Sequence, residues 1–100
     1  MDEYSVKLTS RAIRDLDGIY GYIAKTLLEP GTALKLVERI ERELASLSSM
    51  PNRCPERKTG AYANRSYRQL FIENYTAVFR VDEKSKTVIV VTIRYAPSVF

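Results

Sequence analysis

The stretch that most constrains the fold is residues 65–95, in which β-branched and aromatic residues dominate. Two short polar breaks, at Glu73-Asn74 and at residues 82–86, divide it into three segments of about seven to nine residues, a length typical of strands. Successive side chains of a strand point to opposite faces. The odd positions of the middle segment are mostly apolar: Tyr75, Ala77, Phe79 and Val81. One face of this strand is therefore predicted to lie against a core.

The last segment, residues 87–93, is nearly continuous valine and isoleucine. Such a run is typical of a central strand that is covered on both faces, rather than of an edge strand. A three-stranded meander with one apolar face does not stand alone in water, so the N-terminal half of the chain must cover it.

The N-terminal half begins with a short predicted strand, because residues 4–8 alternate apolar and polar side chains. Thr9 or Ser10 can then cap a helix. Apolar residues recur in that helix every three or four positions, as one stripe: Ile13, Leu16, Ile19, Tyr20, Ile23 and Leu27. Gly18 and Gly21 lower the helix propensity, and they either allow close approach of a partner element or are simply tolerated.

A second amphipathic helix follows after Glu29-Pro30-Gly31, and we expect Thr32 to cap it. Its apolar stripe is Ala33, Leu36, Val37, Ile40, Leu44 and Leu47. The opposite face is charged, with Glu38 and Arg42 spaced for an i,i+4 pair, which is typical of a solvated face. The short break between the helices predicts an antiparallel hairpin.

These elements predict an α+β fold in one domain, residues 1–100, with an N-terminal strand and a helical hairpin packed on one face of an antiparallel sheet of about four strands. The core between hairpin and sheet is expected to contain Ile13, Leu16, Tyr20, Ile23, Leu36, Ile40, Leu44, Phe79, Val91 and Ile93. Residues 52–64 show no periodicity, and irregular segments of that length are usually functional or mobile.

Composition narrows the class of protein. No apolar run approaches the ~20 residues of a membrane helix, and the acidic start, residues 1–4, lacks the order of a signal peptide. The single cysteine, Cys54, excludes an internal disulfide, so a cytoplasmic location is expected. Arg53 and Arg57 would favour its thiolate, yet no second catalytic group accompanies it, and we interpret Cys54 as incidental.

The chain contains no histidine. This absence excludes Ser–His and Cys–His nucleophilic machinery and every metal site built on imidazole, and we predict neither a metal nor a cofactor. If the protein is an enzyme, proton transfer falls to lysine, arginine, tyrosine or carboxylate side chains.

The net charge of +4 is concentrated in one segment. Residues 51–68 contain five cations, Arg53, Arg57, Lys58, Arg65 and Arg68, and one anion, Glu56. Their difference of +4 equals the net charge of the whole chain. Tyr62 and Tyr67 are interleaved with these cations. The segment predicts an anionic partner, such as nucleic acid, the ribosome or an acidic protein segment, although solvated loop cations are the alternative.

Three strand residues are further candidates. Arg80 lies on the polar side of the middle strand, where it reaches either a cleft or a pair with Asp82 or Glu83. Tyr95 fills the core if the hairpin pairs odd with odd positions, and otherwise it offers a phenol to a cleft. A tight turn at residues 73–74 would place Arg68 on the face of Leu70 and Ile72, near the end of the sheet.

The order of elements resembles the RelE/ParE superfamily of bacterial toxins over essentially the whole chain. Residues 12–23, AIRDLDGIYGYI, are similar to the family pattern A..DL..I..YI, and residues 44–47, LASL, end the second helix before a proline. Residues 68–81 are similar to the pattern R.L…Y.v.YrV, and residues 88–93 close the sheet.

The resemblance implies the toxin half of a type II toxin–antitoxin pair, with a cognate protein antitoxin that wraps and neutralises it. RelE-like members cut messenger RNA on the ribosome, with Lys, Arg and Tyr side chains in place of histidine. ParE-like members poison DNA gyrase without being nucleases. An uncomplexed toxin is expected to expose an apolar strip or groove for the antitoxin, since wrapping segments derive their affinity from buried area.

The departures from the RelE-like pattern favour the ParE-like reading. RelE-like toxins place basic residues along the first meander strand, after the tyrosine that opens the next strand, and past the last strand. Here those positions hold Gln69 and Phe71, Thr76, and Ala96-Pro97. The chain ends at Phe100, so no C-terminal helix is expected to supply the missing cations.

We therefore expect a toxin that arrests growth by contact with DNA gyrase. The alternative is a ribosome-dependent endoribonuclease that uses Arg68, Arg80 and Tyr95, and a third possibility is an inactive or regulatory binding module. The candidate target-binding residues are Arg57, Lys58, Arg65, Arg68 and Arg80.

Overall fold

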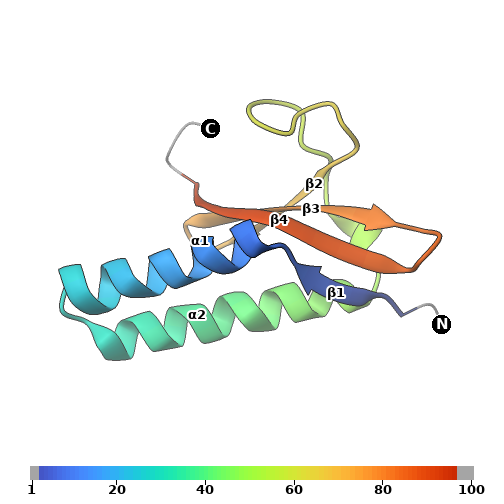
Figure 1. The fold of residues 1–100 in the computed structure, drawn as a ribbon. Coiled ribbons are helices and arrows are strands. Elements are labelled where there is room, and N and C mark those ends of the chain that lie inside the picture. The colour runs from blue at the N-terminus through green and yellow to red at the C-terminus, as the bar shows by residue number, and fades with distance from the viewer. Residues whose placement is uncertain (1–2, 97–100) are drawn as a thin grey trace.

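The computed structural model describes residues 3–96. In chain order the elements are β1 (Ser5–Leu8), α1 (Ser10–Gly21), α2 (Pro30–Ala45), β2 (Arg68–Ile72), β3 (Tyr75–Asp82) and β4 (Thr87–Tyr95). Figure 1 shows the two helices side by side on one face of the sheet, which confirms the predicted α+β fold. Within the described residues, no helix combines the length and the apolar character needed to cross a membrane.

The sheet has the strand order β1-β4-β3-β2, so β4 is a central strand, as its composition predicted. Strands β2, β3 and β4 form an antiparallel meander, whereas β1 pairs in parallel with β4. The sheet is thus mixed at one edge rather than wholly antiparallel. The hairpin returns the chain to the end of the sheet where β1 starts, and a meander of three strands then leaves β4 running in the direction of β1 (Figure 1).

A β-bulge between β3 and β4 changes which side chains of β4 face the helices. Ala77 lies opposite Ile93, but beyond the bulge Phe79 lies opposite Val90. One extra residue of β4 is accommodated at this point, so the core-facing positions shift by one. The prediction of Val91 as a core residue is therefore wrong, because Val91 is only partly buried while Val90 is fully buried.

One buried cluster joins the hairpin to the sheet. Its larger members are Leu16, Ile40, Leu44, Leu47, Ile72, Phe79, Val88, Val90 and Ile93, with Leu36 packed against them. Ile23 is also buried. The helical and strand periodicities therefore located most of the core.

Two predicted core residues of α1 lie at its rim instead. Ile13 is 49% exposed and Tyr20 is 38% exposed. One residue advances about 100° around an α-helix. Ala12, Leu16 and Ile19 form the row that contacts the core. Ile13 directly follows Ala12 and Tyr20 directly follows Ile19, so both lie beside the contact with the sheet rather than in it.

The helix starts follow one prediction and contradict another. Thr9 caps α1, because its Oγ1 accepts the N–H of Ala12 at 3.1 Å. Helix α2 begins at Pro30, whose fixed φ suits the first helical position. Thr32 therefore lies inside the first turn, where its hydroxyl donates to the Glu29 carboxylate at 3.4 Å, and it does not cap the helix.

Candidate functional site

The long segment between α2 and β2 forms a loop whose two ends are joined by backbone hydrogen bonds. The N–H of Arg57 donates to the carbonyl of Tyr67 at 2.8 Å, and the N–H of Gln69 donates to the carbonyl of Pro55 at 3.0 Å. Glu56 and Arg68 form an antiparallel bridge at the same place. Figure 1 shows the loop on the side of the sheet away from the helices.

Arg57 lies inside this loop and is only 8% exposed. Its Nε donates to the carbonyl of Ala61, and its Nη1 donates to Oε1 of Gln69 at 3.0 Å. Burial lowers the pKa of the guanidinium, but an arginine remains protonated in proteins. The sequence could not separate this residue from its neighbours, since a buried and an exposed arginine look alike in a basic segment.

Lys58 and Arg65 are the exposed cations of the loop. The rings of Tyr62 and Tyr67 lie edge to face with their centroids 5.0 Å apart, and both residues are partly buried. Aromatic rings packed on each other in this way are poor platforms for stacking single-stranded bases. The loop surface therefore offers charge rather than a stacking site.

Arg68 lies on the helix-facing side of the sheet, as the tight turn at residues 73–74 predicted, because it shares a face with Leu70 and Ile72. Its Nη1 donates to the carbonyl of Cys54 at 2.5 Å. Cys54 is buried, and burial raises the pKa of its thiol despite nearby Arg53 and Arg68. The expectation that neighbouring cations favour the thiolate is wrong, because desolvation dominates.

Arg80 is exposed and lies on the opposite face of the sheet, since it follows the core residue Phe79 along β3. The pKa of Asp82 on the same strand is lowered, chiefly by hydrogen bonds from Ser85 and to a smaller degree by the charge of Arg80. Arg80 and Arg68 therefore emerge from opposite faces.

Tyr95 lies opposite Tyr75, on the helix-facing side, so the odd-with-odd register holds at this end of the sheet. The two rings are edge to face at 5.6 Å, and Tyr95 is 49% exposed. Burial is the main reason why the pKa of Tyr75 is raised. Tyr95 is thus a half-exposed wall residue rather than core filler.

The three nuclease candidates are not brought together. On β3, Phe79 lies opposite Arg68 and Tyr75 lies opposite Tyr95. Phe79 and Tyr75 are four positions apart along that strand. Four positions correspond to about 13 Å at 3.3 Å per residue. Arg80 lies on the other face of the sheet. Of the remaining RelE-like positions, Ala96 is exposed and Pro97 lies outside the described residues.

An apolar groove lies between α1 and the end of the sheet, and the sequence led us to expect such a groove without indicating its location. Its volume is about 730 Å³. The apolar and aromatic lining residues are Ile19, Tyr22, Ile23, Leu27, Tyr75, Ile93 and Tyr95, with Arg14, Asp15, Gly18 and Arg94 among them. A Cβ built on Gly18 would meet nothing within 4 Å, so this glycine leaves space in the groove rather than permitting a contact within the chain.

The floor of the groove is fixed by polar contacts between α1 and β4. Oδ2 of Asp15 accepts the hydroxyl of Thr92 at 2.5 Å and the N–H of Ile93 at 3.1 Å. Strand β1 ends at Leu8, opposite Val90, so this part of the β4 edge lies beyond the reach of β1. The Asp15 carboxylate thus satisfies backbone that a neighbouring strand would otherwise satisfy.

The shape of the groove also depends on the irregular end of α1. A π-helical turn, Tyr22–Thr26, continues α1, and Leu28 follows with φ of 56°. Tyr22 is 58% exposed and Leu27 is 51% exposed. The signal available in the sequence was an apolar stripe on this helix wider than one sheet contact can bury, from which the prediction assigned Ile13, Leu16, Tyr20 and Ile23 to the core and gave Leu27 no role.

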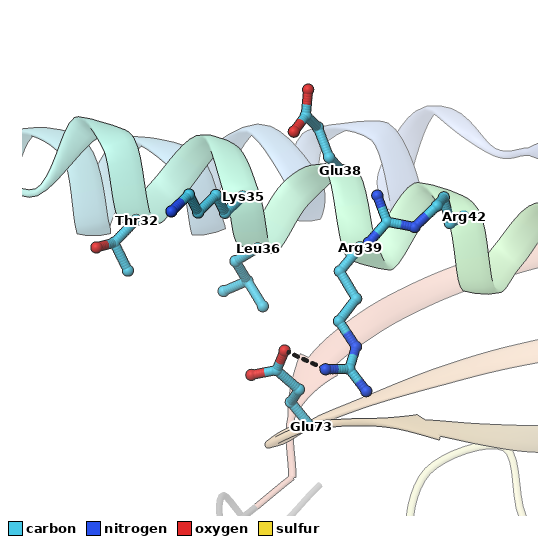
Figure 2. Close-up of a pocket in the computed structure, with 7 residues that line it drawn as sticks. All are labelled: Thr32, Lys35, Leu36, Glu38, Arg39, Arg42 and Glu73. Carbon is cyan, nitrogen blue, oxygen red and sulfur yellow. Dashed lines mark ion pairs between the residues drawn. The ribbon is translucent and has the colours of Figure 1, made fainter.

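A smaller hollow of about 380 Å³ lies between α2 and the β2–β3 turn (Figure 2). Arg39 Nη1 and Glu73 Oε2 form an ion pair of 3.1 Å across it, and both side chains are about half exposed. No ion pair joins Glu38 to Arg42 in Figure 2, contrary to their i,i+4 spacing. Exposed ion pairs of this kind contribute little to stability. The three cations and two anions that line the hollow largely cancel, so it is a weak candidate for binding a charged ligand.

Comparison with known families identifies one match. The family described as "ParE toxin of type II toxin-antitoxin system, parDE" matches residues 6–97. A search of curated proteins found no match.

Solved structures show the same fold. A chain of the chromosomal ParDE toxin–antitoxin system from P. aeruginosa is 29% identical, with a TM-score of 0.77, and the match covers 95% of this chain and 98% of that one. A chain of the RelBE2 toxin–antitoxin complex from Mycobacterium tuberculosis is 22% identical, with a TM-score of 0.61 and coverages of 95% and 93%. A chain of the E. coli RelBE complex is 14% identical, with a TM-score of 0.61 and coverages of 93% and 96%.

Proposed function

This chain belongs to the ParE toxin family of type II toxin–antitoxin systems, and we propose that it arrests growth by binding DNA gyrase in the cytoplasm. The proposal includes a cognate antitoxin that covers the exposed apolar surface of the toxin. The structurally similar P. aeruginosa chain comes from a system of toxin and antitoxin, which supports the same arrangement here.

The separation of Arg68, Arg80 and Tyr95 carries the preference for protein contact over RNA cleavage. A nuclease without histidine needs its acid, base and charge stabilisers around one reacting phosphate. Here two candidates share a face but lie about 13 Å apart along the strands, and the third emerges from the other face. This arrangement supports a binding surface rather than a catalytic centre.

The groove between α1 and β4 is the surface we assign to the antitoxin. It holds apolar and aromatic side chains that remain exposed in the free chain, including Tyr22, Leu27 and Tyr95. A segment that folds onto such a groove gains affinity from the apolar area it buries. Arg14 and Arg94 lie at the groove, so a carboxylate on the antitoxin segment would complement it.

The side of the sheet away from the helices is the surface we assign to the target. Lys58, Arg65 and Arg80 are exposed on or beside it, and Phe71 is 60% exposed on the same face. Cations mixed with an exposed aromatic residue suit an acidic protein surface. Arg57 and Arg68 are held by contacts within the chain, so we leave them out of the direct contact.

The decisive experiment measures target and mechanism together. Purified toxin should inhibit supercoiling by gyrase in a dose-dependent manner, and added antitoxin should restore it. Primer extension on messenger RNA from arrested cells should show no cuts at defined codon positions. Codon-specific cuts would instead identify a ribosome-dependent endoribonuclease, and a chain that neither inhibits gyrase nor arrests growth would be a regulatory binding module.

The antitoxin assignment has a separate test. Co-expression with the product of the adjacent gene should yield a stable complex at micromolar concentration. Independent elution of the two proteins at low salt would contradict the assignment, whatever the cellular target.

A further inference from the structure

We infer that Arg57 is a positioning residue that holds the loop of residues 57–67 in the shape needed for target contact, while Lys58 and Arg65 make the contact. This inference rests on the proposed function. It divides the basic segment into one internal organiser and two exposed cations, a division that charge alone did not reveal.

The contacts of Arg57 span the loop. Its backbone N–H closes the base on Tyr67, and its backbone carbonyl accepts the N–H of Asn64 at 3.1 Å. Its side chain donates to the carbonyl of Ala61 and to the amide oxygen of Gln69 on β2. One residue thus connects the base, the middle and the far side of the loop to the sheet.

The backbone of the loop needs such an organiser. Tyr62, Asn64 and Ser66 have φ values of 69°, 58° and 66°, and Gly60 has 79°. Left-handed conformations at residues other than glycine persist only where surrounding contacts over-determine them, and they concentrate at binding and active sites. Contacts from Arg57 reach Ala61 and Asn64, inside this strained stretch.

Burial separates the role of Arg57 from that of its neighbours. Arg57 is 8% exposed, whereas Lys58 and Arg65 are exposed. A buried guanidinium is retained where hydrogen bonds compensate its desolvation, and its planar fork can bond two acceptors at fixed angles, which a lysine cannot do. A partner protein can therefore contact Lys58 and Arg65 directly, whereas Arg57 affects the partner only through the shape of the loop.

The test alters the acceptor of Arg57 rather than Arg57 itself. Gln69→Leu removes the side-chain acceptor at nearly constant size, and Gln69→Glu keeps an acceptor oxygen and serves as the rescue variant. Amide hydrogen exchange reports loop opening directly. In Gln69→Leu we expect the amide protons of Arg57 and Asn64 to exchange at least ~10-fold faster than in the wild type, with growth arrest weakened, and we expect Gln69→Glu to restore both.

The matched control is Lys58→Ala combined with Arg65→Ala. It should weaken growth arrest while the exchange of the Arg57 and Asn64 amides stays at the wild-type rate. All variants should bind the antitoxin like the wild type, since the groove lies on the other side of the sheet. This control separates loss of loop shape from loss of charge.

Two results would overturn the inference. One is wild-type exchange in Gln69→Leu, which would show that Arg57 does not hold the loop. The other is fast exchange with undiminished growth arrest, which would show that loop shape is irrelevant to the target. A wild-type chain that does not arrest growth would contradict the proposed function, and this inference with it. That outcome differs from failure of the inference alone, in which the wild type is active.

Discussion

The two faces of the sheet are built by different kinds of interaction. On the helix-facing side, Phe79 and Ile93 are fully or almost fully buried under α1 and α2. On the other side, which we call the open face, Phe71 and Arg80 are exposed although Thr76 and Val78 between them are buried. The loop on this side is held by hydrogen bonds around Arg57. Hydrophobic burial is non-directional and tolerates small displacements, whereas a hydrogen-bonded loop depends on individual atoms. We therefore expect substitutions on the helix side to affect stability, and substitutions of the exposed residues on the open face to affect function.

The largest expected effect compares two phenylalanines on neighbouring strands. Phe79→Ala should lower the free energy of unfolding by about 3–5 kcal/mol, because it removes a fully buried ring and leaves a cavity. Phe71→Ala, on the open face and 60% exposed, should change it by no more than about 0.5 kcal/mol. Urea unfolding of both variants measures the difference. Equal losses would show that the open face is as tightly packed as the helix side.

The next effect concerns a polar contact on the helix side. Asp15→Ala removes the acceptor of the Thr92 hydroxyl and the Ile93 N–H, and it should cost about 1.5–3 kcal/mol of unfolding free energy. The control is Asp17→Ala, which alters an exposed carboxylate on the same helix and should cost no more than about 0.5 kcal/mol. Thermal unfolding distinguishes them. If the two variants unfold together, the carboxylate does not stabilise the contact between α1 and β4.

The helix side was largely predictable from the sequence, and the exceptions have physical causes. Periods of two and of three to four located Phe79, Ile40 and Leu44 correctly. Val91 was misplaced because a bulge shifts the register, and pattern alone does not reveal where a ladder gains a residue. Ile13 was misplaced because a helix contacts a sheet along a narrow row.

The candidate sites were less predictable. The sequence predicted that the basic segment meets an anionic partner, which stays a prediction, and it treated Arg57 as equivalent to Lys58. What separates them is a hydrogen bond to Gln69, twelve residues along the chain, and that depends on how the loop folds back. The location of the groove was missed because Leu27 belongs to the apolar stripe of the predicted helix while Tyr22 lies outside it, and only the three-dimensional packing shows that the sheet ends before covering them.

A smaller effect separates two tyrosines of the first helix region. Tyr22 lines the groove and Tyr20 does not. Tyr22→Ala should weaken antitoxin binding roughly 10-fold, since a truncated aromatic residue near the centre of an interface loses buried area. Tyr20→Ala should leave the affinity nearly unchanged. Isothermal titration of each variant with the antitoxin measures this, and equal affinities would place the antitoxin elsewhere.

Charge on the open face should act on association rather than on stability. Arg80→Glu should slow association with gyrase several-fold at low salt, with a smaller difference at high salt, because exposed charges steer encounter and salt screens them. Arg11→Glu carries the same charge change on the helix side and should leave association close to wild type. Stopped-flow or surface plasmon resonance at two ionic strengths measures both. Equal slowing by the two variants would indicate a net-charge effect and not a local contact.

The smallest effect lies at the β3–β4 turn, outside both faces. The pKa of Glu83 lies below its ordinary value of 4.5, because its carboxylate accepts hydrogen bonds from Asn52 at 3.0 Å and Tyr4 at 2.8 Å. A carboxyl whose pKa is lower in the folded state stabilises the fold above its unfolded pKa, and this contribution disappears as pH falls through the folded pKa.

The thermal unfolding temperature should therefore fall on acidification below the ordinary pKa of Glu83. The fall should be steeper in the wild type than in Glu83→Gln. Asp82, whose pKa is also lowered, is present in both proteins, so it does not affect the comparison. Asn52→Ala should reproduce part of the flattening, because it removes the largest cause of the shift while leaving the carboxylate in place. Parallel pH profiles for wild type and Glu83→Gln would show that Glu83 contributes nothing to acid sensitivity, and would leave Asp82 as the carboxylate of this turn whose lowered pKa could account for it.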